Sequence, residues 1–213
     1  MKSSTLKTQP ISTLAGLVLC LGLAVVPRHT AIAGTDGAAT VQAFYDTLLD
    51  TMRNGARLGM QGRYAELTPA IRRNFDIPLM TRLAVGPAWG GLNPTQQAQV
   101  TQAFERYVAA VYAERFDSYS GEQLKVTGET ASTAGTVITS QIVSSSGEPV
   151  HINYLMRQNG GAWQIADVYL NGTISELATR RSDFASILAT RGIDGLIAAL
   201  NEKTAALGAV RAS

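Results

Sequence analysis

Cysteine and histidine are scarce in this sequence, and each shortage excludes a kind of chemistry. Cys20 is the only cysteine among the 213 residues, and the two histidines are His29 and His151. A disulfide needs two cysteines, and structural zinc sites need several Cys or His ligands. No G-x-S-x-G, P-loop or H-E-x-x-H motif is present either. The sequence therefore predicts no disulfide, no metal and no cofactor.

Charged residues are also few, and they form no block. They make up 16% of the chain against 46% hydrophobic residues, which is the composition of a globular domain that can bury a core. Lys and Arg exceed Asp and Glu by only 18 to 16, and three of these cations, Lys2, Lys7 and Arg28, precede residue 34 without any acid. Since no basic cluster remains elsewhere, we expect no nucleic-acid partner.

The first 33 residues have the pattern of a secretory signal peptide. Two lysines precede an apolar stretch over residues 11–26, and the small-x-small pattern Ala31-Ile32-Ala33 follows. The apolar stretch is shorter than the roughly 20 residues that a membrane-spanning helix needs. We therefore expect a cleaved signal peptide at residues 1–33 and one exported domain over residues 34–213.

The hydrophobic period changes along the chain from that of helices to that of strands and back. Apolar residues recur at helical spacing from Val41 to Met52, from Val100 to Tyr112 and again from Leu177 to Leu207. Four segments with strand character lie between them, at residues 124–127, 136–143, 150–157 and 163–170. The order predicts an α+β fold with a four-stranded antiparallel meander, covered by the N-terminal and C-terminal helices.

Capping residues indicate where several helices begin. Asn93 precedes a proline and has Gln96 three positions later, which is the capping-box spacing. Asp76 is placed to cap a short helix with Pro78 in its first turn. Thr68-Pro69 has the same hydroxyl-then-proline pattern, so the sequence predicts a helix start there as well.

Single residues offer few candidates for catalysis. His151 is at an outward position of its strand, where a solvated histidine is expected. Asp167 follows Ile165 in a strand whose predicted alternation puts both on one side, together with Trp163 and Tyr169. A carboxylate among apolar groups can have a raised pKa and act as a base. The alternative is that Asp167 binds a backbone amide or an arginine at the sheet edge.

The stretch from Phe75 to Tyr119 resembles a known family through the pattern F-D-x-x-x-M-x-R-x-x-x-G-x-x-W and the residues after it. The residues that carry the pattern are Phe75, Asp76, Met80, Arg82, Gly86, Trp89, Pro94, Gln97, Phe104 and Tyr112. The matching residues nearer the C-terminus are Trp163, Ile165, Asp167, Val168, Gly172, Phe184, Gly192 and Leu196. On these residues the chain, from Thr40 to Lys203, resembles the MlaC/toluene-tolerance (Ttg2-type) family of periplasmic lipid-binding proteins.

Three shorter segments are most similar to the hopanoid-biosynthesis-associated branch of that family, HpnM. These segments are Gly62–Tyr64, Leu83–Trp89 and Tyr112–Glu122. The family resemblance implies a phospholipid ligand, and the likeness to this branch implies a hopanoid-type lipid.

The resemblance implies a periplasmic carrier, not an enzyme. It would hold lipid tails in a cavity between helices and sheet, and pass the lipid between an inner-membrane transporter and an outer-membrane complex. The residues expected to line the cavity are Phe75, Met80, Leu83, Trp89, Phe104, Val108, Tyr112, Ile152, Tyr154, Met156, Val168 and Phe184. Trp89, which lies among Gly and Pro residues, would form a lip of the cavity or plug the core. Met80 and Met156 would let the cavity repack around different tails.

Two other functions stay open on the sequence. An enzyme of this fold would use Asp167 or Asp76 as a base with a tyrosine partner, and Asp167→Asn would then abolish activity without affecting folding. A structural accessory of a membrane transporter would have a filled core and no ligand. The carrier hypothesis predicts instead that Leu83→Trp abolishes function by blocking the cavity.

Overall fold

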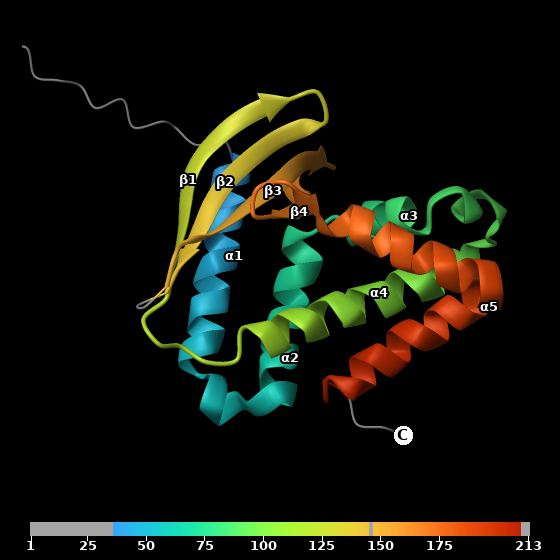
Figure 1. The fold of residues 1–213 in the computed structure, drawn as a ribbon, viewed down its shortest axis with the longest axis horizontal. Coiled ribbons are helices and arrows are strands. Elements are labelled where there is room, and N and C mark those ends of the chain that lie inside the picture. Colours follow the sequence, from blue (N-terminus) through green and yellow to red (C-terminus); the bar gives the residue numbers. More distant parts are fainter. Residues whose placement is uncertain (1–35, 145–146, 210–213) are drawn as a thin grey trace, which may run out of the picture. The chain divides into compact units, whose positions relative to one another are not determined.

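The structure, a computed structural model, describes residues 36–144 and 147–209, so the expected signal peptide and its cleavage site lie outside the described residues. The elements in chain order are α1 (Asp36–Arg53), α2 (Gly55–Asn74), α3 (Ile77–Val85), the 3-10 helix η1 (Gly86–Gly91), α4 (Pro94–Arg115), β1 (Gln123–Ser132), β2 (Gly135–Val143), β3 (Val150–Asn159), β4 (Ala162–Leu170), β5 (Ile174–Ser175) and α5 (Glu176–Ala206) (Figure 1). No helix in this part of the chain is long and apolar enough to span a membrane. The predicted α+β class is confirmed.

The sheet is an antiparallel meander, as predicted, but it has five strands and not four. The strand order is β1-β2-β3-β4-β5, and each strand pairs with its neighbours in the sequence. The added strand, β5, has two residues, Ile174 and Ser175, which pair with the end of β4. Two residues are too few to show a two-residue period, so the sequence pattern missed this strand.

Helix α1 lies across one face of the sheet and contacts β1, β2, β3 and β4 (Figure 1). Its predicted apolar stripe is the face that packs on the sheet, and Val41, Phe44, Tyr45 and Leu48 are completely buried. The helical spacing of the sequence therefore places this stripe correctly.

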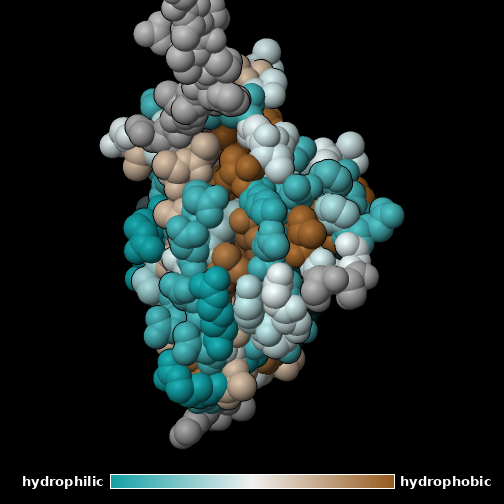
Figure 2. Space-filling view, turned by 90° about the vertical axis from the view of Figure 1, so that its left-hand side faces the viewer, coloured by the Kyte–Doolittle hydropathy of each residue, from teal (hydrophilic) through white to brown (hydrophobic). Residues whose placement is uncertain are grey.

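On the face drawn in Figure 2, hydrophobic residues reach the surface as brown areas bordered by hydrophilic ones.

The junction between α2 and α3 attaches the helices to the sheet. The backbone N–H of Asp76 donates a 2.9 Å hydrogen bond to the carbonyl of Ile165 in β4. The Asp76 carboxylate accepts a 3.1 Å hydrogen bond from the N–H of Leu79, and so caps α3 as predicted. Phe75, next to this link, is buried and turns its ring into the helical layer. One short segment thus fixes the distance between helices and sheet.

One of the other predicted helix starts is confirmed and one is wrong. Asn93 and Gln96 form the capping box at the beginning of α4. No helix begins at Thr68, because α2 continues through Pro69 and the Thr68 hydroxyl donates to the carbonyl of Tyr64. Pro69 gives up one backbone hydrogen bond inside the helix, and the burial of neighbouring apolar residues on the same helix offsets this loss.

A β-bulge changes which residues of β4 face the helices. Leu155 of β3 pairs with Asp167, whereas the next residue, Met156, pairs with Ile165, so that Ala166 is an extra residue in β4. Asp167 and Ile165 therefore lie on opposite faces of the sheet. The expectation that they share a side is wrong, because strict alternation does not hold across a bulge.

Helix α5 consists of two arms that meet at Gly192. This residue has φ 65° and ψ −167°, a conformation that glycine adopts without strain. The chain reverses there, and the two arms run beside α4 (Figure 1). Leu196 and Leu200 of the second arm are buried against the other helices. The predicted helix end at Gly192 is thus confirmed as a break between two helical arms.

Phe44 provides a test of how the helical layer is held together. Its ring contacts the rings of Phe75 at 5.1 Å and Tyr112 at 5.3 Å, both edge to face. Phe44→Ala would open a cavity among three helices, and we expect it to lower the free energy of unfolding by about 3–5 kcal/mol in urea denaturation. Leu83→Ala, at a residue that is 40% exposed, is the control and should cost less than about 1 kcal/mol. Equal losses for the two variants would contradict this packing.

Candidate functional site

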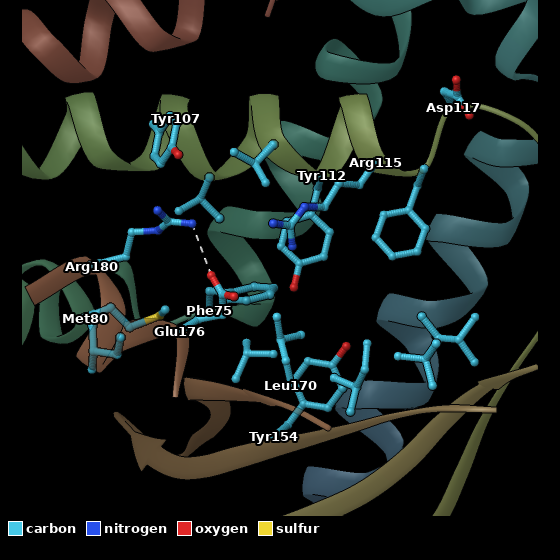
Figure 3. A pocket seen from close by; sticks show the side chains of 18 of the residues that line it. Phe75, Met80, Tyr107, Tyr112, Arg115, Asp117, Tyr154, Leu170, Glu176 and Arg180 are labelled. Atoms are coloured by element: carbon cyan, nitrogen blue, oxygen red, sulfur yellow. Dashed lines mark hydrogen bonds and ion pairs between the residues drawn. The ribbon is translucent and has the colours of Figure 1, made fainter. Parts of the chain in front are cut away.

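A cavity of about 450 Å³ lies between α4 and the sheet. Helix α4 packs mainly against α2 and α5, and this leaves space between α4 and the strands. Figure 3 shows the cavity with α4 above it and the strands below it. Met52 from α1 and Leu177 from α5 also reach the cavity. Most of the lining side chains are aliphatic or aromatic, so the cavity suits a ligand with a hydrocarbon part.

The structure brings eight of the twelve predicted lining residues together at this cavity. They come from the α2–α3 junction, from α3, from one face of α4 and from inward positions of β3 and β4. These residues are Phe75, Met80, Phe104, Val108, Tyr112, Ile152, Tyr154 and Val168. Helical spacing explains the α4 members, which recur every four residues, and the two-residue period explains those of β3.

The other four predicted residues lie away from the cavity, and here the expectation is corrected. Leu83 is 40% exposed on α3, because it is on the outer face of that helix. Trp89 is half-buried in η1 and packs against the core, which is the plug alternative. Met156 is fully buried beside Ile165, where the α2–α3 junction fills the space over the sheet. Phe184 is buried between α4 and α5.

Several lining residues were not predicted. The apolar and aromatic ones are Met52, Tyr107, Val111, Phe116, Ile142, Val150, Leu170 and Leu177. Tyr107 and Val111 belong to the same stripe of α4 as the predicted residues, and Val150 and Leu170 continue the two-residue period of their strands. These residues could therefore have been found by extending the patterns. The charged lining residues carry no such signal in the sequence.

Charged side chains lie at both ends of the cavity. Glu176 and Arg180 at one end form an ion pair of 3.1 Å (Figure 3). Arg180 also pairs with Asp183 at 3.3 Å. Asp117 lies at the opposite end in Figure 3. Arg115 also lines the cavity, and in residues 36–144 and 147–209 no ion pair involves it. An apolar interior with charged ends is the arrangement that an amphipathic ligand requires.

The tyrosine hydroxyls inside the cavity carry no charge. Burial raises the pKa of Tyr112 and raises that of Tyr154 well above the usual value, and burial likewise raises the pKa of Tyr45 behind them. The phenols are therefore neutral at physiological pH. A phenolate covered by a hydrocarbon tail would lose its hydration at a large cost in free energy. Neutral phenols avoid this cost, so the interior suits an apolar ligand.

The two carboxylates considered as catalytic bases, those of Asp167 and Asp76, make hydrogen bonds within the fold. Asp167 accepts hydrogen bonds from the N–H groups of Val168 at 2.7 Å and Leu177 at 3.1 Å, and from the Ser175 hydroxyl at 2.6 Å. This matches the alternative in which Asp167 binds backbone amides. Neither Asp167 nor Asp76 lines the cavity. In the described part of the chain no three His, Cys, Asp or Glu side chains gather closely enough to hold a metal ion.

Asp167→Asn tests the structural role of this carboxylate. The variant has an NH₂ group in place of one carboxylate oxygen, and an NH₂ group does not accept hydrogen bonds from the N–H and O–H donors around Asp167. The first turn of α5 would therefore lose a hydrogen bond. We expect the free energy of unfolding to fall by about 1–3 kcal/mol, measured by urea denaturation. Asp46→Asn, on the exposed face of α1, is the matched control and should change stability by about 0.5 kcal/mol or less. An Asp167→Asn variant as stable as the parent chain would show that these bonds contribute little.

Comparisons with known proteins agree with this architecture. Residues 42–202 match the family model described as MlaC protein. The chain is also similar to a solved structure described as the phospholipid-binding protein from Ralstonia solanacearum in complex with a phospholipid, at 1.53 Å resolution. The two share 24% sequence identity with a TM-score of 0.71, and the match covers 81% of this chain and 99% of that chain. The likeness to the solved structure establishes the fold.

Proposed function

The chain belongs to the MlaC protein family, and from that premise we propose that it is a lipid-binding protein. The cavity between α4 and the sheet would enclose the hydrocarbon of one lipid molecule, and the polar part of the lipid would lie at a charged end. The observation that carries the proposal is the apolar lining of about 450 Å³. Enclosing hydrocarbon there stabilises the complex by about 0.8 kcal/mol for each CH₂ group removed from water.

Phospholipid is the ligand that we favour. The similar protein from Ralstonia solanacearum is described as holding a phospholipid, and it supports the proposal through its shared fold. Arg115 adds a feature of this chain, since it is a cavity-lining cation without an acidic partner among the described residues. A guanidinium group in this position is suited to a phosphate. A hopanoid-type lipid, which the resemblance to the HpnM branch suggests, is the alternative ligand.

We further propose that the protein carries its lipid through the periplasm. The signal-peptide pattern of residues 1–33 and the family membership support this location. In that role the protein would receive or deliver lipid at an inner-membrane transporter and an outer-membrane complex. The capping roles of Asp167 and Asp76, away from the cavity, favour a binding protein over an enzyme.

Val108→Trp tests the cavity as the lipid site. Val108 is half-buried on the face of α4 that lines the cavity, and an indole there would fill space that the tails need. We expect the affinity for phospholipid, measured by uptake from vesicles, to fall at least about tenfold. The indole would exclude two or more CH₂ groups of the lipid from the cavity, and their transfer free energy corresponds to that factor. Circular dichroism would establish that the variant is folded.

Leu83→Trp is the matched control for this experiment. It adds the same indole at a residue that is 40% exposed and outside the cavity, so uptake should be unchanged. Blocking function through Leu83, which the sequence alone suggests, is thus not expected from the structure. Equal uptake by the folded Val108→Trp protein and the parent chain would show that lipid binds elsewhere.

A further inference from the structure

Two tyrosine hydroxyls interrupt the apolar middle of the cavity. Tyr112 comes from α4 and Tyr154 from β3, and both line the cavity. Figure 3 shows that their hydroxyl groups point toward one another from opposite walls, between the charged ends marked by Glu176 and Asp117. A cavity built only to enclose saturated hydrocarbon has no need of hydroxyls there, because any polar group that a tail covers loses its contact with water.

The hydroxyls of Tyr45 and Ser140, which lie behind Tyr154, form hydrogen bonds within the wall of the cavity. Ser140 donates its proton to the carbonyl of Ile152, so the hydrogen bond between Tyr45 and Ser140 has Tyr45 as its donor. Both of these protons are therefore used inside the wall. The ring of Tyr45 packs edge to face on the ring of Tyr154 at 5.8 Å, which holds the Tyr154 ring in place. Tyr45 and Ser140 support the wall, and neither is among the residues that line the cavity.

Tyr112 and Tyr154 therefore give the interior of the cavity a position with hydrogen-bonding capacity. The Tyr154 hydroxyl also interacts with the hydroxyls of Tyr112 and Tyr45. A hydroxyl has one proton and two lone pairs, so the Tyr112–Tyr154 pair still has a proton or a lone pair for a group that reaches it from the cavity. Tyr112 is held from its own side, because its ring contacts Phe44, Phe75 and Phe116. Both phenols are thus fixed and aimed at the space that the ligand would fill. Their raised pKa values keep both protons on the oxygens at physiological pH.

We propose that Tyr112 and Tyr154 bind an oxygen atom that the lipid carries next to its hydrocarbon part. The inference deepens the proposed function and rests on it. The ligand would then be a lipid whose carbonyl or hydroxyl oxygen reaches the hydroxyls of Tyr112 and Tyr154. The protein would bind it more tightly than a hydrocarbon of the same shape. Two sources supply such an oxygen, namely the ester carbonyls of a phospholipid and the hydroxyl of a polycyclic lipid.

Matched pairs of ligands test the proposal and distinguish the two sources. One pair is a diester phosphatidylcholine and the diether phosphatidylcholine of equal chain length, which lacks the carbonyls. The other pair is the pentacyclic alcohol diplopterol and the hydrocarbon diploptene. We expect the mature parent chain to bind the oxygen-bearing member of one pair about three to ten times more tightly, since one hydrogen bond is gained. The pair that shows the preference identifies the source.

Tyr112→Phe and Tyr154→Phe assign the preference to the two hydroxyls. Each variant keeps the ring and removes only the oxygen, so we expect the ratio of affinities within the pair to fall to about one, with binding of the oxygen-poor member unchanged. Tyr107→Phe is the matched control, because Tyr107 lines the same cavity from the same helix but faces Arg180, and its variant should keep the preference. A loss of stability alone would weaken both members of a pair equally and would leave the ratio intact.

The possible results separate this inference from the proposed function. If the parent chain binds both members of each pair equally, or if the preference survives in both Tyr→Phe variants, the role of the tyrosine pair is refuted while lipid binding stands. If the parent chain binds no member of either pair, the proposed function fails and the inference fails with it. If Tyr107→Phe removes the preference as well, the assignment to Tyr112 and Tyr154 is refuted.

Discussion

The contacts of the α2–α3 junction hold the helical layer at a fixed place on the sheet, and the cavity depends on them. Within two residues the chain bonds its backbone to Ile165 of β4, caps α3 with Asp76 and packs Phe75 against Phe44 and Tyr112. Helices α1, α3 and α4 are thereby joined to one strand at one point. Beyond this point α4 and the strands are separated, and the cavity occupies the space between them.

The chemistry of the cavity follows from which groups this arrangement buries and which it leaves at the ends. Hydrocarbon and aromatic side chains from helices and strands cover the interior, and burial keeps the tyrosines inside it neutral. Arg180 is held by Glu176 at one end, whereas Arg115 lies without an acidic partner among the described residues. Transfer of hydrocarbon from water supplies most of the binding free energy in the proposed function. Polar contacts would then decide which lipid is preferred.

Much of the fold could be predicted from the sequence, because the apolar residues that become buried recur at the spacing of helices or strands. The stripe of α1, the capping box at Asn93 and the strands of the meander were all predicted from local patterns. The β-bulge at Ala166 was not, since one extra residue changes the alternation without changing composition. Leu83 was misplaced for a related reason, because a short helix has too few turns to show which apolar residue faces inward. Arg115 and Arg180 reach the cavity through tertiary packing, which leaves no local signal.

The most direct test of the lipid-binding account is to determine what the protein holds when it is made by its own cells. The mature chain would be purified gently from the periplasm and examined by native mass spectrometry, with organic extraction of any bound molecule. The account predicts a stoichiometric lipid whose hydrocarbon fits a cavity of about 450 Å³. A protein that is recovered empty, and that also takes up no lipid from phospholipid vesicles, would contradict the account.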